Sequence, residues 1–325
     1  MTDGLKRIRL WCWMLALLML SGCGGSPGAP ASGGSSGGTT APPAAEAEKP
    51  EKDENFTPYD TPDFADAQFH EDLAEGGNGV RLDLSAVDQG YLGASVVADA
   101  RLKLQVIREE ITYNYDMASD GTPSIFPLQS GDGTYTVRVM KNVSESKYTE
   151  LYTASCDVAL ADEFQPFLRP NDYVNYSQGS DCVKKAAQLA AQAGDEVGVV
   201  SAVYDYICTS VSYDADKAAS VRNGYLSQPD ATMASGKGIC FDYAALAAAM
   251  LRSQGIPTKM IFGYVSPNDL YHAWNMFYTD QTGWVTVSYQ VSKDSWNRLD
   301  LTFSANGADD TFVGDGSNYA DLYVY

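Results

Sequence analysis

Cys240 stands at the start of a segment that should form a helix. Residues 236–239 before it are Gly-Lys-Gly-Ile, and the run after it, FDYAALAAAMLRSQGIP, is rich in strong helix formers. Gly255 and Pro257 stand where such a helix would end, which predicts a helix over about 240–253. The positive end of a helix dipole favours the thiolate form of a cysteine, and the glycines allow a tight loop that leaves the sulfur accessible. Cys240 is therefore a candidate nucleophile, although any one cysteine can equally be buried and unreactive.

His272 is the candidate base for such a thiol. It lies in Tyr-His-Ala-Trp-Asn (271–275), which should begin a strand, and residues 259–265 should form the strand before it. The other histidine of the chain, His70, lies in an acidic segment near the amino-terminal end. A thiolate nucleophile needs a group that takes up the thiol proton and later protonates the leaving amine, and imidazole can do both. A lone histidine is more often structural, so the interpretation depends on the pairing with Cys240.

The two segments together resemble the transglutaminase-like superfamily. The run GKGICFDYAALAAAMLRSQGIP, followed by YHAWN, is similar to the family's Gly-x-Cys at a helix start and its His-Ala-Trp on a strand. The upstream run AVYDYICTSVSYD, which ends in Tyr213 and Asp214, resembles the helix that precedes the core in bacterial members. The resemblance covers about residues 180–325 and implies a papain-like α+β core with a Cys-His-Asp triad. Family members act on peptide or side-chain amides as proteases, amidases or cross-linking acyltransferases, and some relatives have lost catalysis.

The third member of the implied triad is assigned to Asp300. The family pattern places an aspartate in Trp-x-x-x-Asp-x-Thr after the histidine strand, but the first such window, WVTVS at 284–288, has Ser288 in that place. The second window, WNRLDLT at 296–302, fits the whole pattern and contains Asp300. Ser288 beside the imidazole is the alternative outcome, and it would leave the triad incomplete. Asp280 and Asp294 lie in predicted turns and are weaker candidates.

The resemblance implies a thioester mechanism. Cys240 attacks an amide carbonyl, His272 transfers the proton to the leaving amine, and Asp300 holds the imidazole in the required tautomer. The backbone N–H of Cys240 would be one oxyanion donor; the sequence does not identify the second, and Tyr225 and Gln228 upstream of the glycine loop are only suggestions. The chemistry requires no metal or other cofactor, and no EF-hand spacing occurs in the sequence.

The amino-terminal residues 1–22 read as a lipoprotein signal peptide. Three cations within residues 6–9 precede an uncharged apolar run at 10–20, which as a helix of about 16 Å is too short for a bilayer core of about 30 Å. The following Leu-Ser-Gly-Cys (20–23) resembles a bacterial lipobox, so we expect Cys23 to be lipidated. These features predict an exported protein anchored to a bacterial membrane outside the cytoplasm. An ordinary secretory signal with a chance cysteine is the alternative.

Three further segments follow from composition and periodicity. Residues 23–79 begin with Gly, Ser, Pro and Ala and continue with acidic residues, which predicts a disordered tether. Residues 80–177 contain short runs of alternating apolar and polar residues separated by Gly/Asp turns, which predicts an antiparallel β-sandwich. Residues 178–325 should form the transglutaminase-like domain, with helices at 182–193 and 197–211 before the one at Cys240. The predicted fold class is α+β.

Composition excludes several function classes. Lys and Arg total 22 against 42 for Asp and Glu, a formal net charge of −20, which argues against a nucleic-acid binder. Two histidines exclude a His-rich metal site, and no cysteine pair has the CxxC spacing of zinc ribbons. Cys156, Cys182 and Cys208 can form at most one disulfide, whose pairing the sequence does not fix.

The expected partners are a protein or peptide amide, which includes cell-wall peptide, and the membrane that holds the Cys23 lipid.

Two functions are consistent with these observations. The first is a surface enzyme that cleaves or transfers amides through Cys240, as a protease, amidase or transglutaminase. The second is a non-catalytic binding or adhesion module that keeps the same fold as a scaffold. A single thiol that reacts rapidly with iodoacetamide below pH 7 would distinguish the enzyme from the scaffold.

Overall fold

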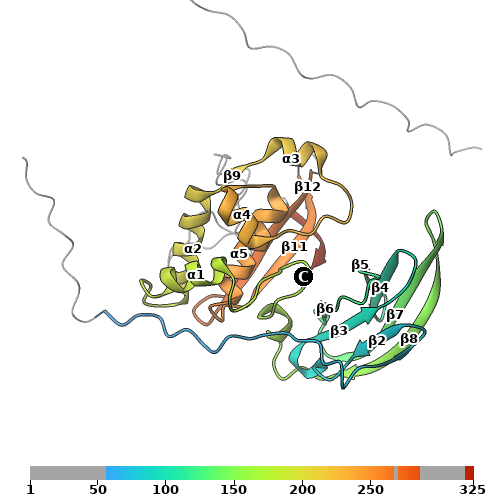
Figure 1. The fold of residues 1–325 in the computed structure, drawn as a ribbon. Helices are drawn as coiled ribbons and strands as arrows, with labels where there is room; N and C mark the ends of the chain where they lie inside the picture. Colours follow the sequence, from blue (N-terminus) through green and yellow to red (C-terminus); the bar gives the residue numbers. More distant parts are fainter. Residues whose placement is uncertain (1–55, 267–269, 286–318) are drawn as a thin grey trace, which may run out of the picture. The chain divides into compact units, whose positions relative to one another are not determined.

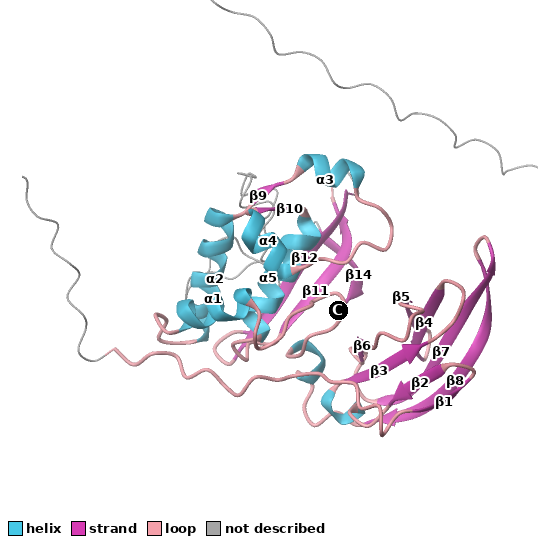
Figure 2. Cartoon of the chain, in the orientation of Figure 1, coloured by secondary structure: helices cyan, strands magenta, loops and turns pink. Residues whose placement is uncertain are grey.

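The computed structural model describes residues 56–266, 270–285 and 319–325. Antiparallel sheets come first, and a region that combines helices with a further sheet follows them (Figure 2). The predicted α+β class is therefore confirmed. The described residues belong to one compact unit, and the division at residue 177 stays a prediction.

Two four-stranded antiparallel sheets make up the first region. The first sheet has the strand order β1 (Glu75–Gly77), β2 (Val80–Asp83), β3 (Tyr91–Val96) and β6 (Ser124–Pro127). The second has the order β5 (Ile111–Met117), β4 (Leu102–Arg108), β7 (Gly133–Ser144) and β8 (Lys147–Val158). Two short 3-10 helices, η1 (Val87–Gln89) and η2 (Gln165–Phe167), lie outside these sheets.

The alternation in the sequence explains why these strands form a sandwich. Leu102, Leu104 and Val106 of β4 are buried, whereas the residues between them are half-buried, as expected when successive side chains point to opposite faces. Tyr115 of β5 and Phe126 of β6 meet edge to face with ring centroids 5.0 Å apart. The apolar faces of the two sheets therefore pack on one another, which confirms the predicted β-sandwich.

The segment before β1, residues 56–74, has no regular secondary structure but makes specific long-range contacts; we call it the N-terminal strap. The Tyr59 hydroxyl donates to the backbone carbonyl of Gln254 at 3.0 Å. Further along, the backbone N–H of His70 donates to buried Asp83 at 2.7 Å. The sequence assigns this segment to the tether because it is acidic and because clear hydrophobic patterning begins only near Val80. The predicted disordered tether extends through residue 79, whereas in the structure residues 56–74 are held by hydrogen bonds to partners distant in the sequence.

The second region contains five α-helices within the described residues. They are α1 (Asp181–Ala190), α2 (Glu196–Ser210), α3 (Ala215–Ser220), α4 (Pro229–Ser235) and α5 (Cys240–Arg252). The predictions for α1, α2 and α5 are confirmed to within a few residues. Helices α3 and α4 lie in residues 213–235, where the sequence predicts no helix. Two short strands, β9 (Ser212–Tyr213) and β10 (Lys237–Gly238), pair in parallel beside them.

One antiparallel sheet completes this region. Its strand order is β13 (Gly283–Val285), β12 (Leu270–Thr279), β11 (Thr258–Val265) and β14 (Tyr319–Val324). Helix α5 packs against β11 and β12 and also contacts α1, α2 and α4, an arrangement that Figure 1 shows. Its alanines leave little side-chain bulk between helix and sheet, and the Asn275 amide of β12 donates to the Ala244 carbonyl of α5 at 3.0 Å. The sheet thus holds the helix that begins at Cys240 in a fixed place.

None of the helices in the described ranges is long and apolar enough to cross a membrane. The predicted signal peptide and Cys23 lie outside the described residues. Export and lipid anchoring therefore stay predictions.

Candidate active site

Cys240 is the first residue of α5, as the sequence predicts. The residue before it, Ile239, occupies the N-cap position, but its apolar side chain cannot accept hydrogen bonds from the free N–H groups of the first turn. Asp242 supplies that partner instead, because its Oδ2 accepts the backbone N–H of Ile239 at 2.9 Å. The Cys240 side chain is partly exposed, whereas the rest of the helix is buried. The thiol therefore sits at the positive end of a rigidly held helix and remains accessible.

His272 lies on β12, where its backbone pairs with Gly263 of β11. It is 4% exposed, and its ring stacks near Trp274 with centroids 6.4 Å apart. Gly263 makes this packing possible, since a Cβ there would lie 2.1 Å from the Ala320 carbonyl oxygen and 2.6 Å from the Trp274 ring. A glycine on the neighbouring strand thus lets β14 and the indole approach the strand that carries the imidazole.

Cys240 and His272 line the same cavity, which has a volume of about 710 Å³. Among the described residues that line it, eight of sixteen are Phe or Tyr, and none is Asp or Glu. The described lining includes one Lys or Arg, Arg222, whose side chain is exposed. In a chain with a net charge of −20, the described lining of the cavity beside the thiol is thus largely aromatic and contains no carboxylate. Such walls suit apolar or planar groups of a ligand.

Two tyrosines lie within electrostatic reach of the Cys240 sulfur. Burial raises the pKa of Tyr213 on β9, and negative charge on Cys240 raises that pKa further. The pKa of Tyr271 on β12 is also raised, chiefly by burial and to a smaller degree by Tyr323, Tyr264 and Cys240. Both phenols therefore stay neutral at physiological pH and can offer O–H donors to a group bound beside the sulfur.

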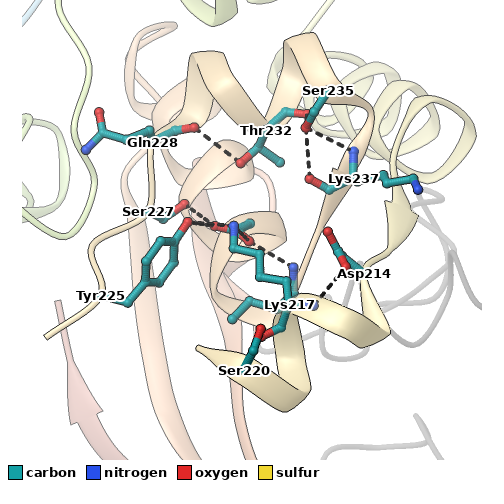
Figure 3. A network of polar contacts seen from close by, with 11 residues as sticks. Asp214, Lys217, Ser220, Tyr225, Ser227, Gln228, Thr232, Ser235 and Lys237 are labelled. Carbon is teal, nitrogen blue, oxygen red and sulfur yellow. Dashed lines mark hydrogen bonds and ion pairs between the residues drawn. The ribbon is translucent and has the colours of Figure 1, made fainter. Parts of the chain in front are cut away.

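A buried carboxylate lies two residues after the thiol. Asp242 is fully buried, and its oxygens accept hydrogen bonds from Lys217 and Tyr225, each at 2.6 Å, and from Ser227 at 2.8 Å. Figure 3 shows Lys217, Tyr225 and Ser227 converging on one point. Sequence reasoning missed this cluster. The signal that could have found it is an acidic residue at the third position of a helix whose cap residue is apolar.

Neither suggestion for the second oxyanion donor fits the structure. The Tyr225 hydroxyl lines the cavity, but it donates its proton to Asp242 at 2.6 Å and accepts one from Lys217 at 2.7 Å. A phenol has one O–H, so none is left for a substrate oxygen. Gln228 lines a different hollow, where its side-chain oxygen accepts from Asn175 at 3.3 Å. Both residues lie upstream of Cys240 in the chain, but only Tyr225 reaches the cavity.

Asp300 and Ser288 both lie outside the described residues, as does the whole window at 296–302. The structure therefore brings Cys240 and His272 to one cavity, while the roles of all three triad residues stay predictions. Four described cysteines form no disulfide bond, namely Cys156, Cys182, Cys208 and Cys240. Within the ranges that the structure describes, no group of three His, Cys, Asp or Glu side chains could hold a metal ion.

Comparison with known proteins gives the following matches. Among solved structures, the chain is similar to a candidate cysteine protease from Cytophaga hutchinsonii, with 16% identity, a TM-score of 0.38 and coverage of 71% of this chain and 73% of that one. It is also similar to the periplasmic domain of TgpA from Pseudomonas aeruginosa, with 12% identity, a TM-score of 0.35 and 76% coverage of each chain. Red sea bream transglutaminase matches with 11% identity and a TM-score of 0.28, over 67% of this chain and 54% of that one. A search of curated proteins finds no match.

The family comparison falls on the region that carries the site. Residues 183–289 match the model of the transglutaminase-like superfamily. The matched range includes both Cys240 at the start of α5 and His272 on β12. The α+β region of this chain therefore contains a transglutaminase-like superfamily domain.

Proposed function

We propose that the protein is an exported lipoprotein, anchored through Cys23, that cleaves or transfers peptide and side-chain amides with Cys240 as its nucleophile. The observation that carries the proposal is the shared cavity, since a helix-start thiol and a buried imidazole line one accessible space. The substrate class is a protein or peptide amide, including cell-wall peptide. The aromatic walls favour an apolar or aromatic side chain beside the amide that reacts.

The reaction would proceed in two balanced steps. The Cys240 sulfur attacks the carbonyl carbon, and the C–N bond breaks as His272 delivers the former thiol proton to the leaving amine. Water, or a second amine, then attacks the thioester carbon and gives up a proton to His272. The C–S bond breaks, and His272 returns that proton to the Cys240 sulfur. The first acceptor makes the enzyme a protease or amidase, and the second makes it a transglutaminase. Asp300 would hold the imidazole in line with the sulfur throughout.

Alkylation tests the nucleophile. Purified protein would be treated briefly with iodoacetamide at pH 6.5, and the labelled cysteines would be identified by peptide mass spectrometry. We expect rapid labelling at Cys240 alone, because Cys182 is buried, and burial also raises the pKa of the Cys156 thiol. Cys208→Ala is the matched control and should leave the labelling rate unchanged. A Cys240 no faster than Cys208 would favour the non-catalytic module.

The triad assignment needs a second pair of variants. Asp300→Asn should preserve the fold and lower turnover of an amide substrate by roughly 10³- to 10⁴-fold, because the amide stabilises the wrong imidazole tautomer. Ser288→Ala should leave turnover within about twofold. The opposite ranking would assign the third position to Ser288 and remove the basis for a complete triad.

A further inference from the structure

The Asp242 carboxylate is the most heavily hydrogen-bonded group near the thiol. Its Oδ2 accepts from the Ile239 backbone N–H at 2.9 Å and from the Lys217 ammonium at 2.6 Å. Its Oδ1 accepts from the Tyr225 hydroxyl at 2.6 Å and from the Ser227 hydroxyl at 2.8 Å. Four donors from three separate segments thus meet one carboxylate that is completely buried. Figure 3 shows the three side-chain donors pointing toward one another.

Lys217 is the one positive charge in this cluster. It lies on the short helix α3. The Asp214 side chain caps the start of this helix by accepting the Lys217 backbone N–H at 2.9 Å. The side chain is 30% exposed, and its ammonium also donates to Tyr225 at 2.7 Å. Burial alone would lower the pKa of Lys217, but the hydrogen bonds to Asp242 and Tyr225 outweigh it and raise that pKa. The ammonium therefore stays charged throughout the neutral range.

The charge of this cluster bears on Cys240 because Asp242 is only two residues further along α5. An uncompensated carboxylate there would oppose negative charge on the sulfur and offset the positive end of the helix dipole. With Lys217 beside it, the pair adds no net charge to the first turn. We propose that Lys217 is a positioning residue that acts through Asp242: it neutralises the carboxylate that anchors the first turn of α5, and so keeps the Cys240 thiolate accessible at neutral pH.

Within the part of the chain that the structure describes, the other titratable groups around the thiol do not supply this function. Burial raises the pKa of Tyr173, Tyr213, Tyr225, Tyr271 and Tyr325, so these cavity tyrosines are neutral around pH 7. Arg222 is exposed to solvent, where its field is screened. His272 is the one titratable group of β12 besides Tyr271 that faces the cavity, and its charge changes during the proposed reaction. Lys237 on β10 is exposed and does not line the cavity. The remaining cavity-lining tyrosines are Tyr173, Tyr213, Tyr225, Tyr323 and Tyr325.

The test measures how fast iodoacetamide modifies Cys240 as a function of pH, in the full chain and in single and paired variants. An elementary charge about 8 Å away at an effective dielectric constant of about 40 should move the midpoint of the rate–pH curve by roughly 0.7 unit. Lys217→Met should raise the midpoint by about that amount. Asp242→Asn should lower it, and the double variant should return it close to the wild-type position.

Two controls separate the charge effect from a loss of structure. Lys237→Met removes an exposed cation of β10 that has no role in the pair, and should move the midpoint by less than about 0.2 unit. Lys217→Arg keeps the charge and should stay near wild type. If Lys217→Met fails to fold, the Asp242→Asn and Lys217→Arg variants still decide the matter, through a lowered and an unchanged midpoint respectively.

The labelling results distinguish a charge effect of Lys217 from a purely structural role of the cluster. The proposal is overturned if the two single variants shift the midpoint in the same direction, or if neither differs from Lys237→Met, since both results would give the cluster a structural role alone. The inference rests on the proposed function only in treating Cys240 as the reactive thiol. If wild-type Cys240 is not labelled at all below pH 7, the proposed function fails. If it is labelled but the variants do not diverge, only the role of Lys217 fails.

Discussion

Gly238 offers a sharp test of how closely the loop before Cys240 must pack. A Cβ at this position would lie 2.7 Å from the Asp242 Cβ, 3.2 Å from the Thr232 Cγ2 and 3.3 Å from an Asp242 carboxylate oxygen. The φ of Gly238 is not in the left-handed region, so the effect of alanine is steric. Asp242 cannot move aside easily because four hydrogen bonds hold it, and Thr232 is buried. The strain must therefore displace the first turn of α5.

We expect Gly238→Ala to lower the free energy of unfolding by about 1–3 kcal/mol, which is the usual cost of an added methyl group in a filled interior. For a unit of this size that corresponds to a fall in Tm of about 2–10 °C. Gly77→Ala is the matched control, since a Cβ there meets nothing within 4 Å, and it should change stability by less than about 0.5 kcal/mol. Urea unfolding measures both, and iodoacetamide labelling of Cys240 should slow only in Gly238→Ala. Equal stability of the two variants would refute the steric reasoning.

Two further predictions concern the amino-terminal half of the chain. Burial would raise the pKa of Asp83, but hydrogen bonds from Ser85 and His70 outweigh it and lower that pKa below the usual 3.8. The stabilisation that the Asp83 carboxylate contributes is therefore present at neutral pH and is lost as the pH falls through the folded-state pKa. Asp83→Asn should therefore be less stable than wild type by about 1–2 kcal/mol in urea unfolding at pH 7, and the difference should shrink as the pH falls through the lowered folded-state pKa of Asp83. A difference that does not change with pH would show that charge has no part in it. Cys23→Ala should release the protein from the membrane fraction, and a variant that stayed bound would mean that the apolar run at 10–20 is a retained membrane helix.

The parts of the site that sequence predicts well are local. Helix formers from 241 onward and Gly255 at the end predict a helix over 240–253, and the structure has Cys240–Arg252. The strand around His272 follows from its position after a turn and from the resemblance to His-Ala-Trp. In these segments, neighbours in the sequence supply most of the determining interactions, so composition and spacing were enough to place the thiol and the imidazole on their elements.

The parts that sequence misses depend on distant partners. The donors to Asp242 lie at Lys217, Tyr225 and Ser227, in a polar stretch whose apolar residues show no regular period, so nothing in the pattern indicates that they converge. The N-terminal strap is a second case, since Tyr59 bonds to Gln254, 195 positions away. Acidic, proline-containing composition is typical of a tether, and only the three-dimensional contacts distinguish a packed segment from a free one.

The strand order around β11 has a consequence for the course of folding. Helix α5, β11 and β12 follow one another directly in the chain, so the unit that carries Cys240 and His272 closes only short loops. The other neighbour of β11 is β14, which pairs Val324 with Ile261 about 60 positions away. Closing a longer loop costs more chain entropy, and non-local pairings form more slowly. We therefore expect the nucleophile and the base to come together in an early folding step, and the aromatic wall that β14 contributes to be added in a later one.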